Sequence, residues 1–426
     1  MKLNNSSVWT AGLICSLSCL SWLGLASLVL PSKSVAQPST SEPALTKQIP
    51  RFERREYNPA VLHLRFTEAA GRTSKTDADA FLDLTLILAS GDVKGVRVDL
   101  SFKDFKAQLR KLYSQLSRLE PLNETDPAAP SRQLHAVLIA PLMPILLEEG
   151  VTSLLIGADR GLQAVPFSAL NDGERFFGDR FAFSITPSLA LTTFDASDEP
   201  SRRLLAFGAS QFDGLASLPL VPQELNQIGS QGGKDQFLNQ EFTPSALFEK
   251  AGSADYNQLH VATHAEFKSG GPTASQLHSG TGPISMERLT ALRKSRRGVP
   301  FDLVVFSACR TALGDADAEL GFSGLALQAG ARSAIGTLWY VDDVVTSAYF
   351  VQMYRYLTQG VPKAEAMQLT RQAFIRGQIR LQNDQVVAAE GPPLLTDLTP
   401  TQQRRVANGV ENPFFWAGIG LMGAPW

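Results

Sequence analysis

The feature that most restricts the fold is an alternation of short apolar segments with helical segments in the second half of the chain. The run LVVF at 303–306 is continuously apolar, as a strand buried on both faces requires. Alternating strands and helices are typical of a parallel sheet covered on both faces, so we predict a three-layer α/β/α fold with a mostly parallel sheet. The expected strands are 204–208, 256–263, 301–307, 333–339 and 414–422, and the expected helices are 222–229, 245–250, 319–329 and 344–357.

Two reactive residues directly follow strands of this predicted sheet. His264 comes after the strand 256–263, and Cys309 comes after the strand 301–307. Functional groups in open parallel sheets gather just beyond the carboxyl ends of the strands. His264 precedes Cys309 by 45 residues, close to the ~50 residues that separate histidine from cysteine in caspases. The pattern therefore indicates a His–Cys pair at one edge of the sheet.

The first 36 residues resemble a secretory signal. Lys2 precedes a long uncharged apolar stretch, and Ser34 and Ala36 are small residues at the two positions that a signal peptidase reads. We predict cleavage after Ala36 and export, either to the periplasm or out of the cell. The rival interpretation is an uncleaved membrane anchor, because 8–30 is long enough to span a bilayer. Residues 37–56 form a Pro- and Ser-rich flexible lead-in.

Cysteine usage makes Cys309 conspicuous. Cys15 and Cys19 lie within the predicted signal, so the mature chain keeps one thiol and has no disulfide framework. A lone cysteine after an apolar strand is more often a buried packing residue than a nucleophile. Because Cys309 is paired with His264 at matching strand ends, we give the interpretation as a nucleophile the same weight as the interpretation as a packing residue.

The rest of the mature chain divides into two halves at a polar, Pro-containing seam, residues 195–203. The first half, 57–194, reads as α+β and the second, 195–426, carries His264 and Cys309. The hydrophobic periodicity of the first half does not show whether this half repeats the fold of the second half or is a supporting subdomain. In the first half we expect strands at 60–66, 81–89, 96–102 and 152–156, a helix at 104–119 capped by Asp104, and a Pro-interrupted helix at 134–147.

A cysteine–histidine pair suits acyl transfer. A free thiol is only a few per cent thiolate near neutral pH, so it needs a neighbouring base, here His264. The backbone N–H of Cys309 and one near Ala265 are the expected donors to the oxyanion.

Several motifs in this order resemble the CHAT family of cysteine peptidases, relatives of caspases and separases. They are LQAVPFSAL at 162–170, LHVATHA at 259–265, FSACRTA at 306–312, GFSGLA at 321–326, AGARSAIGTLW at 329–339 and NPFFWAG at 412–418. The resemblance runs from about Tyr57 to Gly423. It implies a caspase-like fold with His264 as base and Cys309 as nucleophile.

Three departures from this family bear on activity. Many relatives have glycine where this chain has Ala265, and a positive φ there would strain alanine. Relatives of the metacaspase type that cleave after arginine carry an acid two residues before the cysteine, where this chain has Ser307. Cleavage after Arg or Lys is therefore less expected by that route. The helical repeats that often accompany the domain are absent, so any regulatory partner is unidentified.

Other residues near the predicted site carry weaker signals. Trp339 and Asp342 are candidates for a substrate pocket, although helix capping is the commoner role for Asp342 and Asp343. The Gly-rich segment 269–282 is expected as a loop beside the cleft. Five scattered histidines and a single mature cysteine do not build a zinc site, and we expect no metal or cofactor. A net charge of -2 gives no reason to expect a nucleic-acid partner.

Two functions follow from these observations. The first is an exported endopeptidase that acts on protein or peptide substrates through a Cys309 acyl-enzyme. The alternative is a catalytically silent caspase-like module that binds peptides or partner proteins. In either case, the N-terminal segment provides membrane attachment if it is not cleaved.

Overall fold

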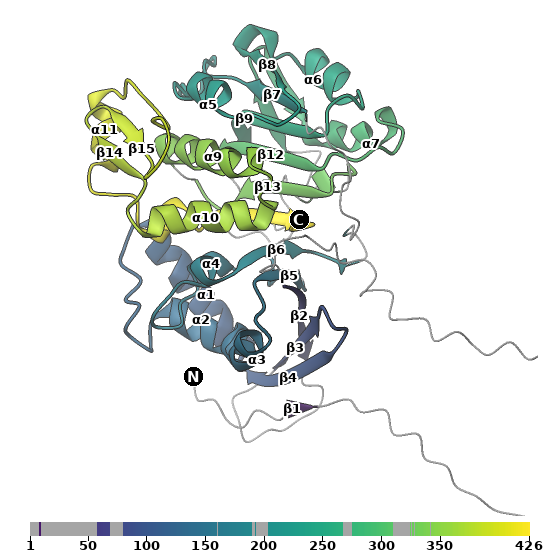
Figure 1. Cartoon of the computed structure of the whole chain (residues 1–426), viewed down its shortest axis with the longest axis vertical. Coiled ribbons are helices and arrows are strands. Elements are labelled where there is room, and N and C mark those ends of the chain that lie inside the picture. The colour runs from purple at the N-terminus through teal and green to yellow at the C-terminus, as the bar shows by residue number, and fades with distance from the viewer. Residues whose placement is uncertain are drawn as a thin grey trace, which may run out of the picture.

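A computed structural model gives the fold of the chain (Figure 1). It describes residues 8–9, 58–68, 80–159, 161–189, 192, 203–266, 275–309, 324, 326–327, 329–340 and 342–426. The predicted seam at 195–203 lies outside these residues except for 203, as do most of the predicted helix at 319–329 and most of the predicted signal. Within that helix, residues 324, 326 and 327 are described and are helical.

Five parallel strands form the centre of the second half. Their order is β8-β7-β9-β12-β13, and each neighbouring pair runs in the same direction. The predicted α/β fold with a mostly parallel central sheet is confirmed. The strands are β7 (Leu204–Gly208), β8 (Lys234–Leu238), β9 (Gln258–Glu266), β12 (Leu303–Cys309) and β13 (Ser333–Thr337).

The β12 strand separates two hydrophobic cores. Leu303 and Val305 pack into one core, whereas Val304 and Phe306 pack into the other. Since successive strand residues point to opposite faces, this alternation shows that both faces of β12 are covered.

Helices cover the two faces of this part of the sheet. On the first face, α9 contacts both α5 and α10, and their apolar residues belong to the core that contains Val305. On the second face, α6 and α7 supply Leu247 and Leu292 to the core that contains Phe306. Their bounds are α5 Val221–Gln227, α9 Asp343–Thr358, α10 Lys363–Ile375, α6 Pro244–Ala251 and α7 Leu292–Ser295.

The first half extends the same sheet. Its order is β4-β3-β2-β5-β6, and β6 joins the second half through β16 (Ile419–Gly423), which in turn pairs antiparallel with β13. Within the described residues this makes a 14-stranded sheet, which runs from bottom to top of Figure 1. The remaining bounds are β2 Pro59–Glu68, β3 Ala80–Leu88, β4 Val93–Leu100, β5 Ser153–Ala158, β6 Ala182–Thr186 and the two-residue β1, Val8–Trp9, which pairs with β4.

Helices of the first half begin close to their predicted positions. The first, α1, begins two residues before the predicted start, and its N-cap is Ser101, whose hydroxyl accepts the N–H of Asp104. The prediction that Asp104 is the cap was therefore wrong. The bounds are α1 Phe102–Ser117, α2 Pro130–Leu138, η1 Ala140–Leu142, α3 Met143–Glu148, η2 Phe167–Ala169 and α4 Phe177–Arg180.

Two segments predicted as irregular contain regular elements. The Gly-rich segment 269–282 contributes to a hairpin of β10 (Gln276–Ser279) and β11 (Gly282–Ser285) at the edge of β9. The polar stretch 382–411 contains most of a second hairpin, β14 (Arg380–Gln382) with β15 (Gln385–Val387), and α11 (Pro400–Val406). The short helices are η4 Asn239–Glu241, η6 Met286–Ala291 and η7 Pro413–Phe415.

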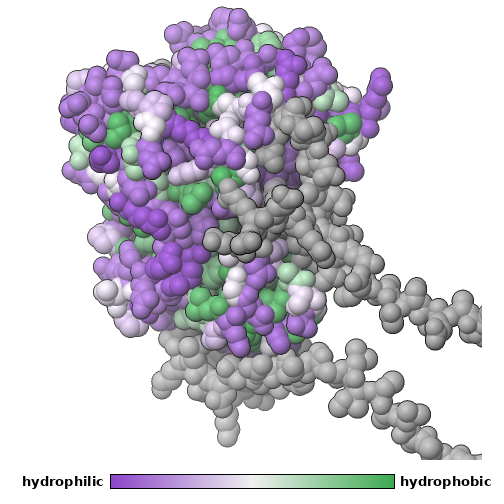
Figure 2. Space-filling view, in the orientation of Figure 1, coloured by the Kyte–Doolittle hydropathy of each residue, from purple (hydrophilic) through white to green (hydrophobic). Residues whose placement is uncertain are grey.

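The surface is mixed in character. On the face seen in Figure 2 hydrophilic residues predominate, and hydrophobic residues occur in small groups between them. No helix in the described part of the chain is both long and apolar enough to cross a membrane.

A buried ion pair ties α10 to the start of β12. The ammonium of Lys363, with a side chain 1% exposed, lies 2.9 Å from a carboxylate oxygen of Asp302, with a side chain 6% exposed. Removing one partner of a buried pair leaves the other charge uncompensated.

We therefore expect Asp302→Asn to lower the free energy of unfolding by about 3–5 kcal/mol, measured by urea denaturation. The matched control is Glu120→Gln, which removes an exposed pair with Arg118 and should cost about 1 kcal/mol or less. Equal losses in the two variants would contradict a structural role for the buried pair.

Candidate functional site

The site lies where β9 and β12 reach their carboxyl ends. The two strands pair in parallel from Leu303↔Gln258 to Cys309↔His264, so Cys309 and His264 are direct partners across the ladder. Both residues lie inside their strands rather than after them, because β9 runs on to Glu266 and β12 ends at Cys309. The structure thus places the backbones of the two predicted residues side by side.

Near His264, β9 changes the strand with which it pairs. On the side away from β12, it pairs with β7 up to Gly208↔Ala262, and with β10 from Leu277↔Ala265 onward. His264 falls between these two pairings. The sheet therefore opens beside His264, and the chain leaving β7 has room to fold back over it.

The segment 209–220 that follows β7 holds the His264 ring. Nε2 of His264 lies 2.7 Å from the carbonyl oxygen of Ala216. The ring of Phe212 packs on the imidazole, with the ring centroids 4.7 Å apart. Because a carbonyl only accepts, Nε2 carries the hydrogen in this bond when the ring is neutral, and Nδ1 keeps its lone pair.

Hydrogen bonds close this segment into a defined loop. Leu218 donates its backbone N–H to the Ser210 carbonyl at 2.9 Å. The side-chain oxygen of Asn239 accepts both the N–H and the hydroxyl of Ser210, at 2.8 and 3.1 Å. At Gly208 a Cβ would lie 2.6 Å from the side chain of Val221, so the glycine allows α5 to start close against β7. The Ala216 carbonyl is thus placed by the loop's own backbone.

Ala265 adopts the extended backbone of β9 and is 3% exposed. Its φ is not positive, so alanine is unstrained where relatives have glycine. The departure at this position therefore introduces no backbone strain.

Trp339 and Asp342 occupy structural positions at the start of α9. Trp339 is 3% exposed, and its indole N–H donates to the Phe414 carbonyl at 2.9 Å. Its ring also lies against Gly418, where a Cβ would come within 2.6 Å of it. Asp342 caps α9 by accepting the N–H of Val344 at 2.9 Å. These contacts favour packing and capping roles, and Asp342 rather than Asp343 is the cap.

Arg405 of α11 connects the polar stretch 382–411 to the N-terminus of α9. Its guanidinium lies 3.0 Å from Asp342 and 2.8 Å from Asp343. Burial raises the pKa of the Asp342 carboxyl, and the charge of Asp343 adds to this effect, while Arg405 opposes it. The arginine therefore bridges two adjacent acidic side chains at one helix terminus.

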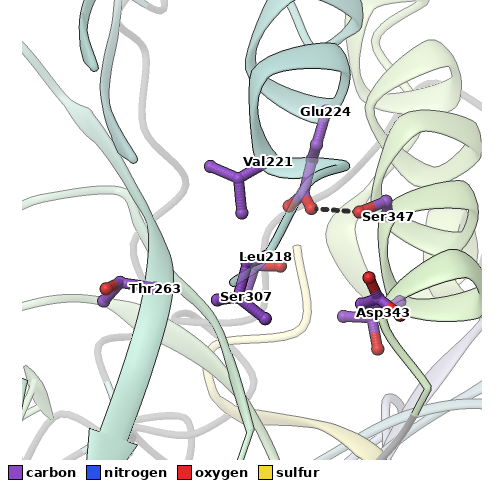
Figure 3. A pocket seen from close by; sticks show the side chains of 8 residues that line it. Leu218, Val221, Glu224, Thr263, Ser307, Asp343 and Ser347 are labelled. Atoms are coloured by element: carbon purple, nitrogen blue, oxygen red, sulfur yellow. Dashed lines mark hydrogen bonds between the residues drawn. The ribbon is translucent and has the colours of Figure 1, made fainter. Parts of the chain in front are cut away.

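A pocket opens beside the paired strand ends (Figure 3). Thr263 precedes His264 directly, and Ser307 comes two residues before Cys309, so the strands bring the pocket to the candidate pair. Glu224 and Val221 of α5 face it from one side, and Asp343 and Ser347 of α9 face it from the other.

Glu224 is a buried acid that the spacing of motifs did not reveal. It is 1% exposed, and its carboxylate lies 2.9 Å from Nε2 of His260 and accepts the Ser347 hydroxyl at 2.7 Å. His260, which is fully buried, also packs edge-on against Phe350 and Tyr354 of α9. The sequence did contain a sign of this buried acid, because Glu224 lies on the same side of α5 as the apolar residues Val221 and Leu225.

No group of three or more His, Cys, Asp or Glu side chains is arranged to hold a metal in the described residues. The Glu224–His260 pair lacks a third ligand of that kind. What the arrangement offers is an imidazole ring held by a carbonyl, the backbone of a cysteine paired beside it, and an acidic pocket alongside.

Comparison with solved structures finds distant similarity. Yeast (Saccharomyces cerevisiae) separase, from a separase–securin complex, has a TM-score of 0.48 and 10% identity over 87% of this chain. This chain covers only 30% of the separase chain. The Arg-specific cysteine proteinase gingipain R has a TM-score of 0.39 and 9% identity, covering 68% of each chain.

Sequence comparison gives a broader match. No curated protein is similar enough in sequence to match the chain. The family model described as "CHAT domain" matches residues 128–424, which is well over half of the 426 residues and includes His264, Cys309 and every strand of the second half. The chain therefore belongs to the CHAT domain family.

Proposed function

We propose that this chain is a cysteine endopeptidase with Cys309 as nucleophile and His264 as general base. The observation that carries the proposal is the ladder pairing of Cys309 with His264 at the ends of two adjacent parallel strands. The 2.7 Å contact between His264 and the Ala216 carbonyl supports it, because it leaves Nδ1 available as the base.

The proposed reaction proceeds in two steps. Nδ1 of His264 takes the proton of the Cys309 thiol, and the sulfur attacks the peptide carbonyl carbon. The C–N bond then breaks, and the imidazolium returns its proton to the departing amine, leaving a thioester. In the second step Nδ1 deprotonates a water molecule, which attacks the thioester and releases the acid and the thiol.

The negative charge on the carbonyl oxygen needs donors in both steps. We propose the backbone N–H groups of Cys309 and Ala265 for this role. The extended, unstrained backbone of Ala265 is compatible with it. The Ala216 carbonyl keeps the imidazole oriented during each transfer, since it accepts from Nε2–H.

We further propose that the reaction takes place outside the cytoplasm, on protein or peptide substrates. This part rests on the sequence of residues 1–36, with its apolar stretch and small residues at 34 and 36. Membrane attachment follows if that segment is retained.

The tautomer of His264 is a direct consequence of the Ala216 contact. In the neutral ring, ¹⁵N NMR of histidine-labelled protein should show Nε2 protonated and Nδ1 unprotonated. Signals absent from a His264→Gln variant assign the ring. A neutral ring protonated at Nδ1 would contradict the proposed base.

Cleavage itself is tested with a peptide library of defined composition, analysed by mass spectrometry. The wild-type chain should produce new peptide termini, and Cys309→Ala and His264→Ala should lower the rate by at least about a hundredfold. Cleavage by all three proteins at equal rates, or by none of them, would contradict the peptidase proposal. The second result would favour a silent module that only binds peptides.

A further inference from the structure

Glu224 is a buried acid that takes no direct part in the proposed reaction. It belongs to the first turn of α5, and its side chain is 2% exposed. Its carboxylate lies 2.9 Å from Nε2 of His260 and accepts the Ser347 hydroxyl at 2.7 Å. A carboxylate only accepts, so His260 carries a hydrogen on Nε2. Figure 3 shows the bond between Glu224 and Ser347 crossing from α5 to α9. The acid therefore joins α5 to both β9 and α9.

The buried Glu224–His260 pair is weak evidence for stability. Removing two polar groups from water offsets most of their attraction, and apolar side chains of similar volume often replace such a pair without loss of stability. Nδ1 of His260 is also buried and has no hydrogen-bond partner among the described residues. What the pair supplies is direction, because apolar contacts are non-directional, whereas a hydrogen bond to a carboxylate fixes a distance and an angle.

His260 lies on the same face of β9 as His264. Residues four apart in a strand point to one face and stand roughly 13 Å apart. Ala262, between them, belongs to the core that α5 and α9 cover, whereas the adjacent Val261 belongs to the other core. Glu224 therefore meets β9 on the face that carries the candidate base.

The loop 209–220 connects α5 to His264. It leads directly into α5, and the Val221 N–H of that helix donates to the Leu218 carbonyl of the loop at 3.2 Å. Within the loop, the Ala216 carbonyl lies 2.7 Å from Nε2 of His264. A shift of α5 along β9 would therefore move this carbonyl relative to the imidazole.

The start of the same loop is fixed to β9 as well. The Ala209 N–H donates to the Ala262 carbonyl at 3.0 Å, which continues the pairing of β7 with β9. The loop and the first turn of α5 thus run between two attachment points on one strand, the Ala262 carbonyl and the His260 imidazole.

We propose that Glu224 is a positioning residue for His264. Its hydrogen bond to His260 sets α5 against β9, and α5 in turn sets the Ala216 carbonyl that orients the imidazole. This inference rests on the proposed peptidase function, because it assigns His264 the role of base. The role needs hydrogen bonds rather than negative charge, since a glutamine at this position accepts from His260 and donates to the Ser347 hydroxyl.

The orientation of His264 is measured by ¹⁵N NMR of the histidine-labelled full chain, which does not depend on cleavage. The wild-type chain and Glu224→Gln should show a neutral His264 ring protonated at Nε2. Glu224→Leu should move both ring ¹⁵N shifts toward those of a free imidazole, in which both tautomers are populated. It should also slow iodoacetamide labelling of Cys309 by at least about tenfold, because a small misplacement of a base is costly.

Two control variants separate positioning from loss of stability. Gln223→Leu makes the same kind of change at the adjacent position, where it removes two hydrogen bonds to Thr396 of the stretch 382–411, at 2.8 and 2.9 Å. Asp302→Asn breaks the other buried pair, at the start of β12. Both should keep the wild-type shifts of His264. A change in either control as large as that in Glu224→Leu would overturn the positioning role.

A three-residue variant, Glu224→Met with His260→Phe and Ser347→Ala, removes the whole polar group and leaves none of its members unpaired. It should unfold at nearly the wild-type urea concentration, yet show the His264 shifts of Glu224→Leu. Wild-type shifts in this variant, failure of this variant to fold, or equal shifts in Glu224→Gln and Glu224→Leu would each overturn the proposal.

These outcomes are separate from the fate of the peptidase proposal. A chain that cleaves library peptides, but whose His264 shifts do not respond to Glu224→Leu, would disprove the positioning role alone. A chain whose shifts respond as expected, but which cleaves nothing, would disprove the peptidase alone.

Discussion

The parallel pairing of β9 with β12 is the constraint on which the rest of the site depends. Seven residue pairs align the strands, and the last pair is Cys309 with His264. Because side chains alternate along a strand, a slip of one residue would move Val305 and Phe306 into the wrong cores. The packing of both faces therefore fixes the register, and the register brings the two backbones together.

The elements that cover one face of the sheet then place polar groups beside the strand ends. The loop between β7 and α5 brings the Ala216 carbonyl to His264, while α5 and α9 place Glu224 and Asp343 at the pocket. The same α5 residue, Glu224, bonds to His260 within β9 and to Ser347 of α9. One buried carboxylate thus links the strand that carries the candidate base to both helices that frame the pocket.

Much of this could be predicted from sequence, because the apolar run of β12 and the strand–helix alternation are local signals. The strand β6 was missed because it is short and because Ser184 and Thr186 interrupt its apolar run, although both are buried. The β10–β11 hairpin was missed because it falls in a Gly-rich segment that reads as a loop. The Ala216 contact left no trace in the sequence, since a backbone carbonyl is independent of residue type. The roles of Cys309 and Ala265 remain predictions.

The reactivity of the Cys309 thiol tests the central claim most directly. Iodoacetamide labelling, followed by mass spectrometry of the peptide that carries Cys309, gives the rate at this position alone. If His264 is its base, Cys309 should react much faster than free cysteine at neutral pH, and His264→Ala should remove the excess. Slow labelling that is unchanged in His264→Ala would contradict the account.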